Sequence, residues 1–212
     1  KFYTTMIAAF TVFIMLELIF QCNYEVEHAF RSSVFQVVSF ITTTGLYSDD
    51  AAKWPHVTWV VLAACMFFGG SSGSTSGGIK SIRGVMLLKV VKNEFRQILH
   101  PNAVLPMKID GYNVQMSKRV TLLGFIGLYL FLAVICAFTM IAAGIDSTNS
   151  MTITLSCLGN VGPTLGLEIG PTMSWNELPD FAKWISSFLM LVGRLELFSV
   201  LVLFTPSFWK EN

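Results

Sequence analysis

The chain has 212 residues, of which 53% are hydrophobic and 13% are charged, and its mean hydropathy is +0.62. Because soluble domains carry about 25% charged residues, this composition indicates a membrane protein. The net charge of +1 gives no indication of a nucleic-acid partner, and the four cysteines lack the spacing of a metal or redox site.

The first apolar stretch, Phe2 to Phe20, is long enough at about 1.5 Å per residue to cross a hydrocarbon core of about 30 Å. A polar and acidic stretch over 21–28 separates it from the mostly apolar segment Phe30 to Phe40. We expect a spanning helix followed by a short helix.

The segment Ile41-Thr42-Thr43-Thr44-Gly45-Leu46 comes next and predicts extended backbone. The threonines are stiff at χ1 because they branch at Cβ, and Gly45 can adopt a positive φ. Extended backbone inside a membrane survives only where it lines a water-filled cavity, and carbonyl oxygens there can replace the hydration shell of an ion. Taken alone, Thr-Thr-Thr-Gly is also compatible with an ordinary surface turn.

A run of ten Gly, Ser and Thr residues, Gly69 to Gly78, interrupts the following apolar stretch, which begins at Trp54-Pro55. About 15 helical residues reach only about 22 Å, short of a core of about 30 Å. The run therefore begins within the membrane, where its backbone needs protein or water around it. A flexible soluble linker has a similar composition.

Two enzyme motifs partly match this run. The segment from Gly73 to Ser81 differs from a phosphate-binding P-loop because one residue separates the last glycine from Lys80 and an apolar helix precedes it. Gly70-Ser71-Ser72-Gly73 fits a short pattern of intramembrane serine proteases, which need a base within hydrogen-bond reach. The three histidines are in loops or at helix ends: His28, His56 and His100. We expect no enzyme, and a membrane-embedded serine hydrolase is the alternative from another class.

An amphipathic basic helix, Ile79 to Leu99, follows, and the connector over 100–118 favours a β-hairpin that turns at Asp110-Gly111. Between residues 80 and 119 there are eight Lys or Arg and only two acids. Cytoplasmic loops of membrane proteins are enriched in Lys and Arg. We therefore place this segment, and with it both termini, in the cytoplasm.

The second half opens with 26 uncharged residues, Val120 to Ile145, which form the clearest spanning helix. Asp146 can cap a second short helix that ends at Leu158. The segment Asn160-Val161-Gly162 comes next. A polar loop then leads to the last apolar run, Phe181 to Phe208, which we expect to be a spanning helix.

The order of spanning helix, short helix, glycine-bearing segment and spanning helix thus occurs twice, over 1–99 and 119–212. Gly45 and Gly162 are equivalent and lie 117 positions apart (162 − 45). Repeats around re-entrant segments are typical of transporters, and a helix that points its C-terminal end at such a segment favours a cation. The sequence predicts an all-α integral membrane protein with two helix–re-entrant loop–helix repeats.

Four motifs resemble the TrkH branch of the Trk/Ktr/HKT potassium transporters: ITTTGLYS, GGSSGSTSGGIKSIRG, GNVGPTLG and MLVGRLELFSVLVLFTPSFW. The resemblance covers nearly the whole chain. The family has four such repeats around a pseudo-fourfold pore, and this chain is similar to the third and fourth. The resemblance implies K⁺ as the transported ion, no organic cofactor, and a location in the bacterial inner membrane.

The resemblance also implies which residues form the site. The selectivity-filter residues would be Thr43, Thr44, Gly45, Asn160, Val161 and Gly162. The Gly/Ser-rich run would be an intramembrane gate beneath the filter, and the gate residues would be Gly69, Gly70, Gly73, Gly77, Gly78, Lys80 and Arg194.

The partners that it implies are an N-terminal half of the transporter with two more filter segments, a second copy in a homodimer, and a cytosolic nucleotide-binding regulatory subunit, TrkA. Na⁺- or H⁺-coupled K⁺ symport is the alternative within transport.

Arg194 is the most unusual charge, because a charge at the centre of a spanning helix costs about 3 kcal/mol. It could pair with Glu17 or with Glu196, although positions two apart on a helix do not face each other. We favour a gate in which Arg194 donates hydrogen bonds to loop carbonyls and repels cations.

Overall fold

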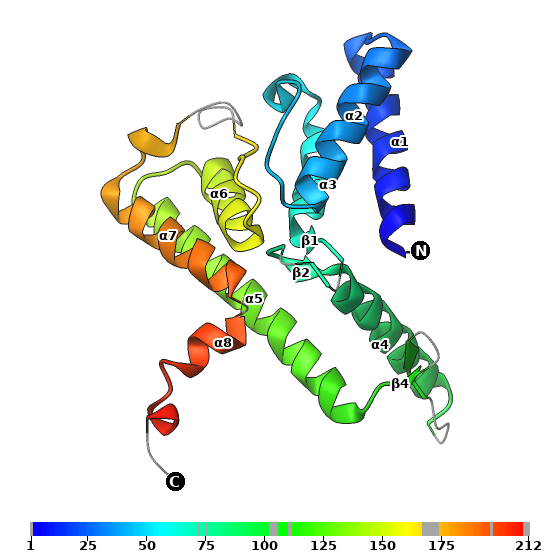
Figure 1. The fold of residues 1–212 in the computed structure, drawn as a ribbon, viewed down its shortest axis with the longest axis vertical. Helices are drawn as coiled ribbons and strands as arrows, with labels where there is room; N and C mark the ends of the chain where they lie inside the picture. Colours follow the sequence, from blue (N-terminus) through cyan, green and yellow to red (C-terminus); the bar gives the residue numbers. More distant parts are fainter. Residues whose placement is uncertain are drawn as a thin grey trace.

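The computed structural model describes residues 2–71, 73–74, 76–101, 106–109, 112–166, 174–195 and 197–209. These residues form two groups of helices, which Figure 1 shows side by side: α1 to α3, and α5 to α7. Helix α4 and a small β-hairpin connect the two groups. Helices dominate the fold, as the sequence predicts, and the described strands are only two residues long.

The first group contains three helices: α1 (Phe2–Cys22), α2 (Val26–Ile41) and α3 (His56–Phe67). Helices α1 and α2 run in opposite directions (Figure 1), and Asn23, with φ 52°, lies in the tight turn between them. Helix α2 begins before the apolar segment because its polar first turn contains Glu27, and an acid there interacts favourably with the helix dipole. The 3₁₀ turn η1 (Ala51–Lys53) precedes α3.

A parallel pair of short strands closes the glycine-rich run. Strand β1 (Phe68–Gly69) pairs with β2 (Ile79–Lys80), and α4 (Ser81–Leu99) follows directly. The run therefore returns to the end of α3, from which it departs. With 12 residues, α3 is about 18 Å long, which is shorter than a membrane core of about 30 Å.

The connector forms an antiparallel pair, β3 (Lys108–Ile109) and β4 (Tyr112–Asn113). The ammonium group of Lys89 on α4 donates a hydrogen bond of 2.7 Å to the carbonyl of Lys108, which attaches the pair to that helix. The expected turn at Asp110-Gly111 lies outside the described residues.

The second group contains α5 (Met116–Ala142), α6 (Ser147–Gly159), η2 (Trp175–Glu177), α7 (Asp180–Arg194), α8 (Leu197–Val202) and η3 (Pro206–Phe208). The Asp146 carboxylate accepts hydrogen bonds from the N–H groups of Thr148 and Asn149, at 2.9 and 3.4 Å. The predicted cap of the second short helix is confirmed.

The last apolar run is divided, so the expectation of one spanning helix over Phe181 to Phe208 is wrong. Helix α7 ends at Arg194, and the separate helix α8 begins at Leu197. A cation in the last turn interacts favourably with the negative end of the helix dipole, which stabilises an ending at Arg194. In both groups, the helix that follows the predicted filter segment is therefore short, with 12 residues in α3 and 15 in α7.

Each group has its own hydrophobic core, and the two cores exchange residues. Val161 and Leu165, which follow α6, are buried in the core of the first group. Ile79 of β2 is buried in the core of the second group. The two groups are therefore packed into one another rather than merely placed side by side.

Two helices in the described part of the chain, α1 and α5, are long and apolar enough to cross a membrane. Helix α3 is apolar but shorter. Such a combination fits a membrane protein whose other helices end at re-entrant segments.

Candidate ion pathway

The first predicted filter segment follows α2 and folds back on the end of that helix. Thr43 has φ 54° and Gly45 has φ 74°. The N–H of Thr44 donates a hydrogen bond of 2.9 Å to the carbonyl of Ser39. The segment is therefore anchored to the last turn of its own helix.

The second predicted filter segment repeats this geometry after α6. Asn160 has φ 52° and Gly162 has φ 106°, and the N–H of Val161 donates to the carbonyl of Ser156 at 3.0 Å. Each of these residues lies 117 positions after its counterpart in the first segment, as the glycines do (162 − 45). The equivalence of Gly45 and Gly162 thus extends to backbone angles and hydrogen bonds.

The prediction of extended backbone is wrong for Thr42 and Thr43. Thr42 has right-handed helical angles, φ −80° and ψ −1°, and Thr43 is left-handed. The N–H and the hydroxyl of Thr42 both donate to the carbonyl of Val38, at 2.9 and 2.7 Å. Hydrogen bonds to the exposed carbonyls of the helix end outweigh the β preference of threonine, so Thr42 caps α2 and the chain turns away at the left-handed Thr43.

The two predicted filter segments meet at Gly45. A Cβ atom at this position would overlap the carbonyl oxygen of Val161 and would lie 3.2 Å from the Cδ of Pro163. This approach and the positive φ together require glycine. A Cβ at Gly162 would meet no atom of the described chain within 4 Å.

The C-terminal ends of α2 and α6 both point toward this meeting place. In Figure 1 they converge on the region of β1 and β2. Neither helix has a basic residue in its last turn. The partial negative charge of the helix ends is therefore not compensated by a neighbouring cationic side chain on the same turn, and it favours a bound cation.

The glycine-rich run packs against the end of α6. The N–H of Gly78 donates to the carbonyl of Leu158 at 3.4 Å. A Cβ at Gly77 would overlap the carbonyl oxygen of Gly159, and one at Gly69 would overlap that of Gly77. These close backbone contacts contradict the flexible-linker alternative and explain why so many glycines are present.

Serine side chains hold the same run together from inside. The N–H of Gly70 donates to the hydroxyl of Ser76 at 3.0 Å, and the Ser81 hydroxyl donates to the carbonyl of Gly69 at 3.0 Å. Ser76 and Ser81 are both buried. Gly73 is exposed, at the part of the run most distant from these contacts, and a Cβ there would meet no described atom within 4 Å.

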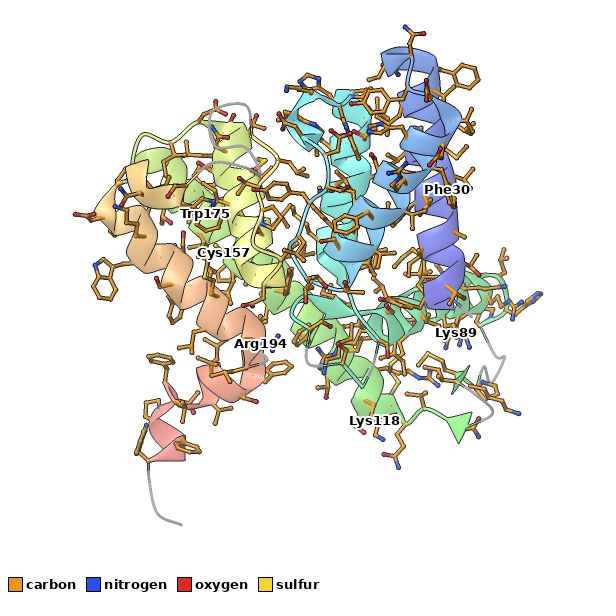
Figure 2. All side chains as sticks on the ribbon, turned by 45° about the horizontal axis from the view of Figure 1, so that its top comes forward. Phe30, Lys89, Lys118, Cys157, Trp175 and Arg194 are labelled. Atoms are coloured by element: carbon orange, nitrogen blue, oxygen red, sulfur yellow. The ribbon has the colours of Figure 1, made fainter. Side chains whose placement is uncertain are left out.

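The two charged gate candidates lie at element ends. Lys80 is half-buried at the end of β2, and Arg194 is the exposed last residue of α7 (Figure 2). A Cβ at Gly193 would overlap the carbonyl oxygen of Leu158, the same group that accepts the Gly78 N–H. The end of α7 and the glycine-rich run therefore meet at one backbone carbonyl.

The described contacts of Arg194 do not test its predicted role as a gate residue. In the described part of the chain, it makes no hydrogen bond with the glycine-rich run. Glu17, one expected ion-pair partner, accepts a hydrogen bond from the Gln21 amide on its own helix. Glu196, the other, lies outside the described residues.

Two serines that no motif singles out form hydrogen bonds with the predicted filter segments. The N–H of Gly162 donates to the hydroxyl of Ser156 at 3.0 Å, and the Ser39 hydroxyl donates to the carbonyl of Leu46. Ser39 and Ser156 are also 117 positions apart (156 − 39). The repeat offset is the sequence signal that identifies them.

The chain is similar to known cation transport proteins, in agreement with the geometry of the two segments. The TrkH family, described as a cation transport protein, matches residues 2–211. The Trk system potassium uptake protein TrkH of Halomonas elongata is 35% identical over 211 residues, which cover 100% of this chain and 43% of that protein. TrkH of Escherichia coli strain K12 is 38% identical over 181 residues, which cover 85% of this chain and 37% of that protein.

The crystal structure of the potassium transporter TrkH from Vibrio parahaemolyticus has the same fold, with a TM-score of 0.91 and 32% sequence identity. The match covers 98% of this chain and 44% of that one. The chain thus spans less than half the length of these relatives. The chain belongs to the TrkH family of cation transport proteins.

Proposed function

We propose that this chain supplies two of the four walls of a K⁺ pathway across the bacterial inner membrane. The observation that carries the proposal is the repeated turn, in which Thr43 to Gly45 and Asn160 to Gly162 share one hydrogen-bond pattern and meet at Gly45. Two helix ends without basic residues add partial negative charge there. Backbone carbonyls would offset the dehydration of the ion, so transport needs no covalent chemistry.

The names of the relatives support K⁺ as the ion. They are called potassium uptake proteins or a potassium transporter. Because the chain spans 37 to 44% of their length, we assign the other two walls to an N-terminal half. Residues 1–99 and 119–212 would be the third and fourth repeats, joined by the connector 100–118. A Cβ at Gly162 would meet no described atom within 4 Å, and we place a neighbouring wall of the pathway on this side of the residue.

We further propose that the glycine-rich run, 69–78, is the gate, together with Lys80 and Arg194. Its backbone contact with the end of α6, at Leu158 and Gly159, supports this, because a movement of the run would be transmitted to the second filter segment. Gly193, which precedes Arg194, packs against the same Leu158 carbonyl, and Arg194 adds a positive charge that repels cations.

The basic segment supports the proposed orientation, with residues 80–119 and both termini in the cytoplasm. Helix α4 and the β3–β4 pair then form the surface that we assign to a TrkA-like nucleotide-binding regulatory subunit. A homodimer of the complete transporter is the proposed assembly.

Uptake of ⁸⁶Rb⁺ by the full-length transporter, in competition with Na⁺, tests the filter assignment. We expect Gly45→Ser and Gly162→Ser to reduce the preference for K⁺ over Na⁺. At Gly45 the new Cβ overlaps the Val161 carbonyl, and at Gly162 the positive φ is strained.

Gly144→Ser is the matched control. Gly144 also has a positive φ, of 91°, and open space around it, but it lies between α5 and α6, away from the filter. Unchanged selectivity in both filter variants, or an equal loss in the control, would overturn the assignment.

The same uptake assay addresses the alternatives. Flux that requires an imposed Na⁺ or pH gradient would favour coupled symport over a channel-like pathway. The hydrolase alternative depends on Ser72, which lies outside the described residues, and the relatives are named as transport proteins. Labelling of Ser72 by a fluorophosphonate would be evidence for hydrolysis.

A further inference from the structure

Ser156, in the last turn of α6, holds the second predicted filter segment at two points. Its backbone carbonyl accepts the N–H of Val161 at 3.0 Å, and its hydroxyl accepts the N–H of Gly162, also at 3.0 Å. The residue is 1% exposed, and a hydrogen bond at such a buried site is stronger than one in water. The hydroxyl therefore fixes the peptide group that joins Val161 to Gly162.

The bond to the Ser156 hydroxyl also sets the direction of a carbonyl. The peptide between Val161 and Gly162 is trans, so its C=O and its N–H point in opposite directions. Because the N–H is directed at α6, the Val161 carbonyl is turned away from that helix. This is the carbonyl oxygen that a Cβ at Gly45 would overlap. Ser156 therefore directs a carbonyl to the place where the two predicted filter segments meet.

Ser39, near the end of α2, holds the first predicted filter segment in a related way. Its carbonyl accepts the N–H of Thr44 at 2.9 Å, and its hydroxyl donates to the carbonyl of Leu46. The residue is 5% exposed. Gly45 lies between these two bonds, so the chain on each side of it is attached to the same serine. Both serines thus use the hydroxyl in addition to the backbone carbonyl.

Two other buried serines on the same helices bond elsewhere. The hydroxyl of Ser33 on α2 donates to the carbonyl of Phe30 at 3.0 Å, and that of Ser150 on α6 donates to the carbonyl of Ile145 at 3.3 Å. Both residues are 0% exposed, and they too are 117 positions apart (150 − 33). These bonds run to backbone that precedes each serine, as is usual for a hydroxyl in a helix. Burial on these helices therefore does not by itself bring a serine hydroxyl to the filter segments.

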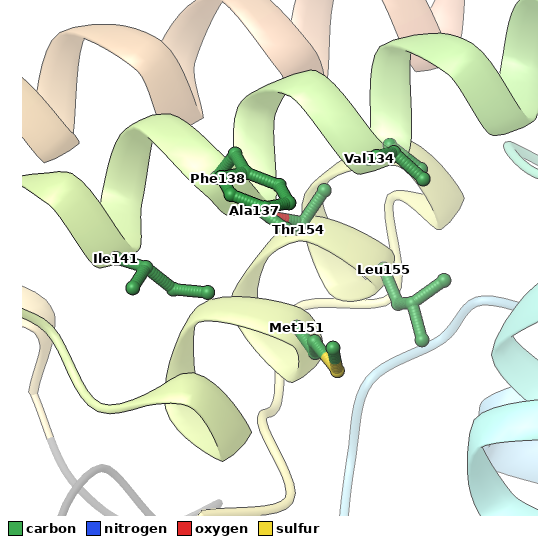
Figure 3. A pocket seen from close by; sticks show the side chains of 8 residues that line it. Val134, Ala137, Phe138, Ile141, Met151, Thr154 and Leu155 are labelled. Atoms are coloured by element: carbon green, nitrogen blue, oxygen red, sulfur yellow. The ribbon is translucent and has the colours of Figure 1, made fainter.

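A groove between α5 and α6 lies beside another face of the same helix. It has a volume of about 270 Å³, and apolar side chains such as Val134, Phe138 and Met151 line it (Figure 3). Ser156 is not among the described residues of this lining. Its hydroxyl is therefore directed at the second predicted filter segment and not at the groove.

We propose that Ser39 and Ser156 are positioning residues that set the preference of the pathway for K⁺ over Na⁺. Their hydroxyls hold the backbone on either side of Gly45 and the Val161 carbonyl in place. Carbonyls at fixed positions fit the larger K⁺, whereas a carbonyl that is free to turn can approach the smaller Na⁺. The inference rests on the proposed function, because it concerns how that filter is held.

Competition for ⁸⁶Rb⁺ uptake by the full-length transporter in liposomes tests the proposal. The measured quantity is the ratio of the Na⁺ concentration to the K⁺ concentration that halves the uptake. Ser39→Ala and Ser156→Ala each remove one hydroxyl bond and keep the backbone bond of the same residue. Since the net strength of one hydrogen bond corresponds to a factor of about five, we expect the ratio to fall about fivefold in each variant.

Ser33→Ala and Ser150→Ala are the matched controls. Each removes a buried hydroxyl bond from the same helix without changing a bond to the filter segments. Both should leave the ratio unchanged. An equal fall in Ser156→Ala and Ser150→Ala would show a general effect of destabilising α6 and would overturn the proposal.

A conservative variant tests the hydroxyl itself. Ser156→Thr retains the oxygen that accepts the Gly162 N–H, so it should keep the ratio of the wild type. A fall as large as that of Ser156→Ala would contradict the role of the hydroxyl. If Ser156→Ala does not reach the membrane, Ser39→Ala against Ser33→Ala decides the question on the other repeat.

The glycine variants separate this inference from the proposed function. If Gly45→Ser and Gly162→Ser lower the ratio and the Ser39 and Ser156 variants do not, the filter assignment stands and the positioning role is wrong. If none of these variants changes the ratio, the filter assignment itself is wrong, and the positioning role is wrong with it.

Discussion

Thr43 and Asn160 occupy the same left-handed conformation at the ends of two short helices, but its cost differs between them. Their φ values are 54° and 52°. Asparagine tolerates this region, whereas a β-branched residue there is a genuine outlier. In both repeats the conformation directs the next N–H to a carbonyl of the preceding helix, that of Ser39 or Ser156. Strain of about 1–3 kcal/mol at Thr43 is thus retained at a position that we propose for the filter.

Substitutions at Asn160 can separate the contribution of backbone strain to the free energy of unfolding from that of the side-chain hydrogen bond. Its Nδ2 donates a hydrogen bond of 3.1 Å to the carbonyl of Met190 on α7. We expect Asn160→Ala to lower the free energy of unfolding by about 2 kcal/mol, since it loses this bond and strains the backbone. Asn160→Gly should cost about 1 kcal/mol less because glycine relieves the strain. Unfolding in detergent micelles, followed by tryptophan fluorescence, measures both, and equal losses would contradict the backbone part.

At the scale of elements, the glycine-rich run behaves as a packed part of the protein. The β1–β2 pair joins the two ends of the run, and its last residues, Gly77 and Gly78, lie against the end of α6. Buried hydroxyl groups of Ser76 and Ser81 satisfy its backbone. Hydrogen bonds of this kind, made within the protein, are what a backbone segment at membrane depth requires.

Two glycines of this run should respond differently to the same substitution. Gly77→Ala places a methyl group on the carbonyl oxygen of Gly159, and we expect a loss of about 1–3 kcal/mol in unfolding free energy. Gly73→Ala meets open space and should change stability by less than about 0.5 kcal/mol. Thermal midpoints in detergent compare the two variants. A Gly77→Ala protein as stable as Gly73→Ala would show that the run does not press on α6.

Much of this element-scale description could be predicted from the sequence. The Asp146 cap, the short helices and the equivalence of Gly45 with Gly162 follow from local chemistry and the repeat. The left-handed Thr43 could not be predicted, because hydrogen bonds to the end of α2 override the β preference of threonine. The contact of Gly77 with Gly159 could not be predicted either, since it joins residues 82 positions apart (159 − 77) that only the tertiary fold brings together.

At the scale of the whole molecule, the gate proposal predicts the effect of removing one charge. Arg194 is the last residue of α7 and follows Gly193, which packs against the carbonyl of Leu158 that also contacts the glycine-rich run. We expect Arg194→Ala to raise ⁸⁶Rb⁺ flux through the full-length transporter several-fold, because a positive charge on the pathway repels cations.

Lys183→Ala is the control for this prediction. Lys183 is on the same helix but pairs with Asp180 at 3.2 Å near its other end. It should leave ⁸⁶Rb⁺ flux unchanged. A flux that falls in Arg194→Ala at normal expression would rule out the gating role.

The exchange of residues between the two cores has a consequence for biosynthesis. Synthesis of the three helices of the first group ends at Phe67, yet the core of this group is complete only when Val161 and Leu165 have also been synthesised. Val161 follows Phe67 by 94 positions (161 − 67). At about 5–20 residues per second, a ribosome needs on the order of 5–20 s to synthesise the chain from Phe67 to Val161. During that interval the core of the nascent first repeat lacks Val161 and Leu165. The final folding step of the first repeat therefore has to follow insertion of the second repeat into the membrane.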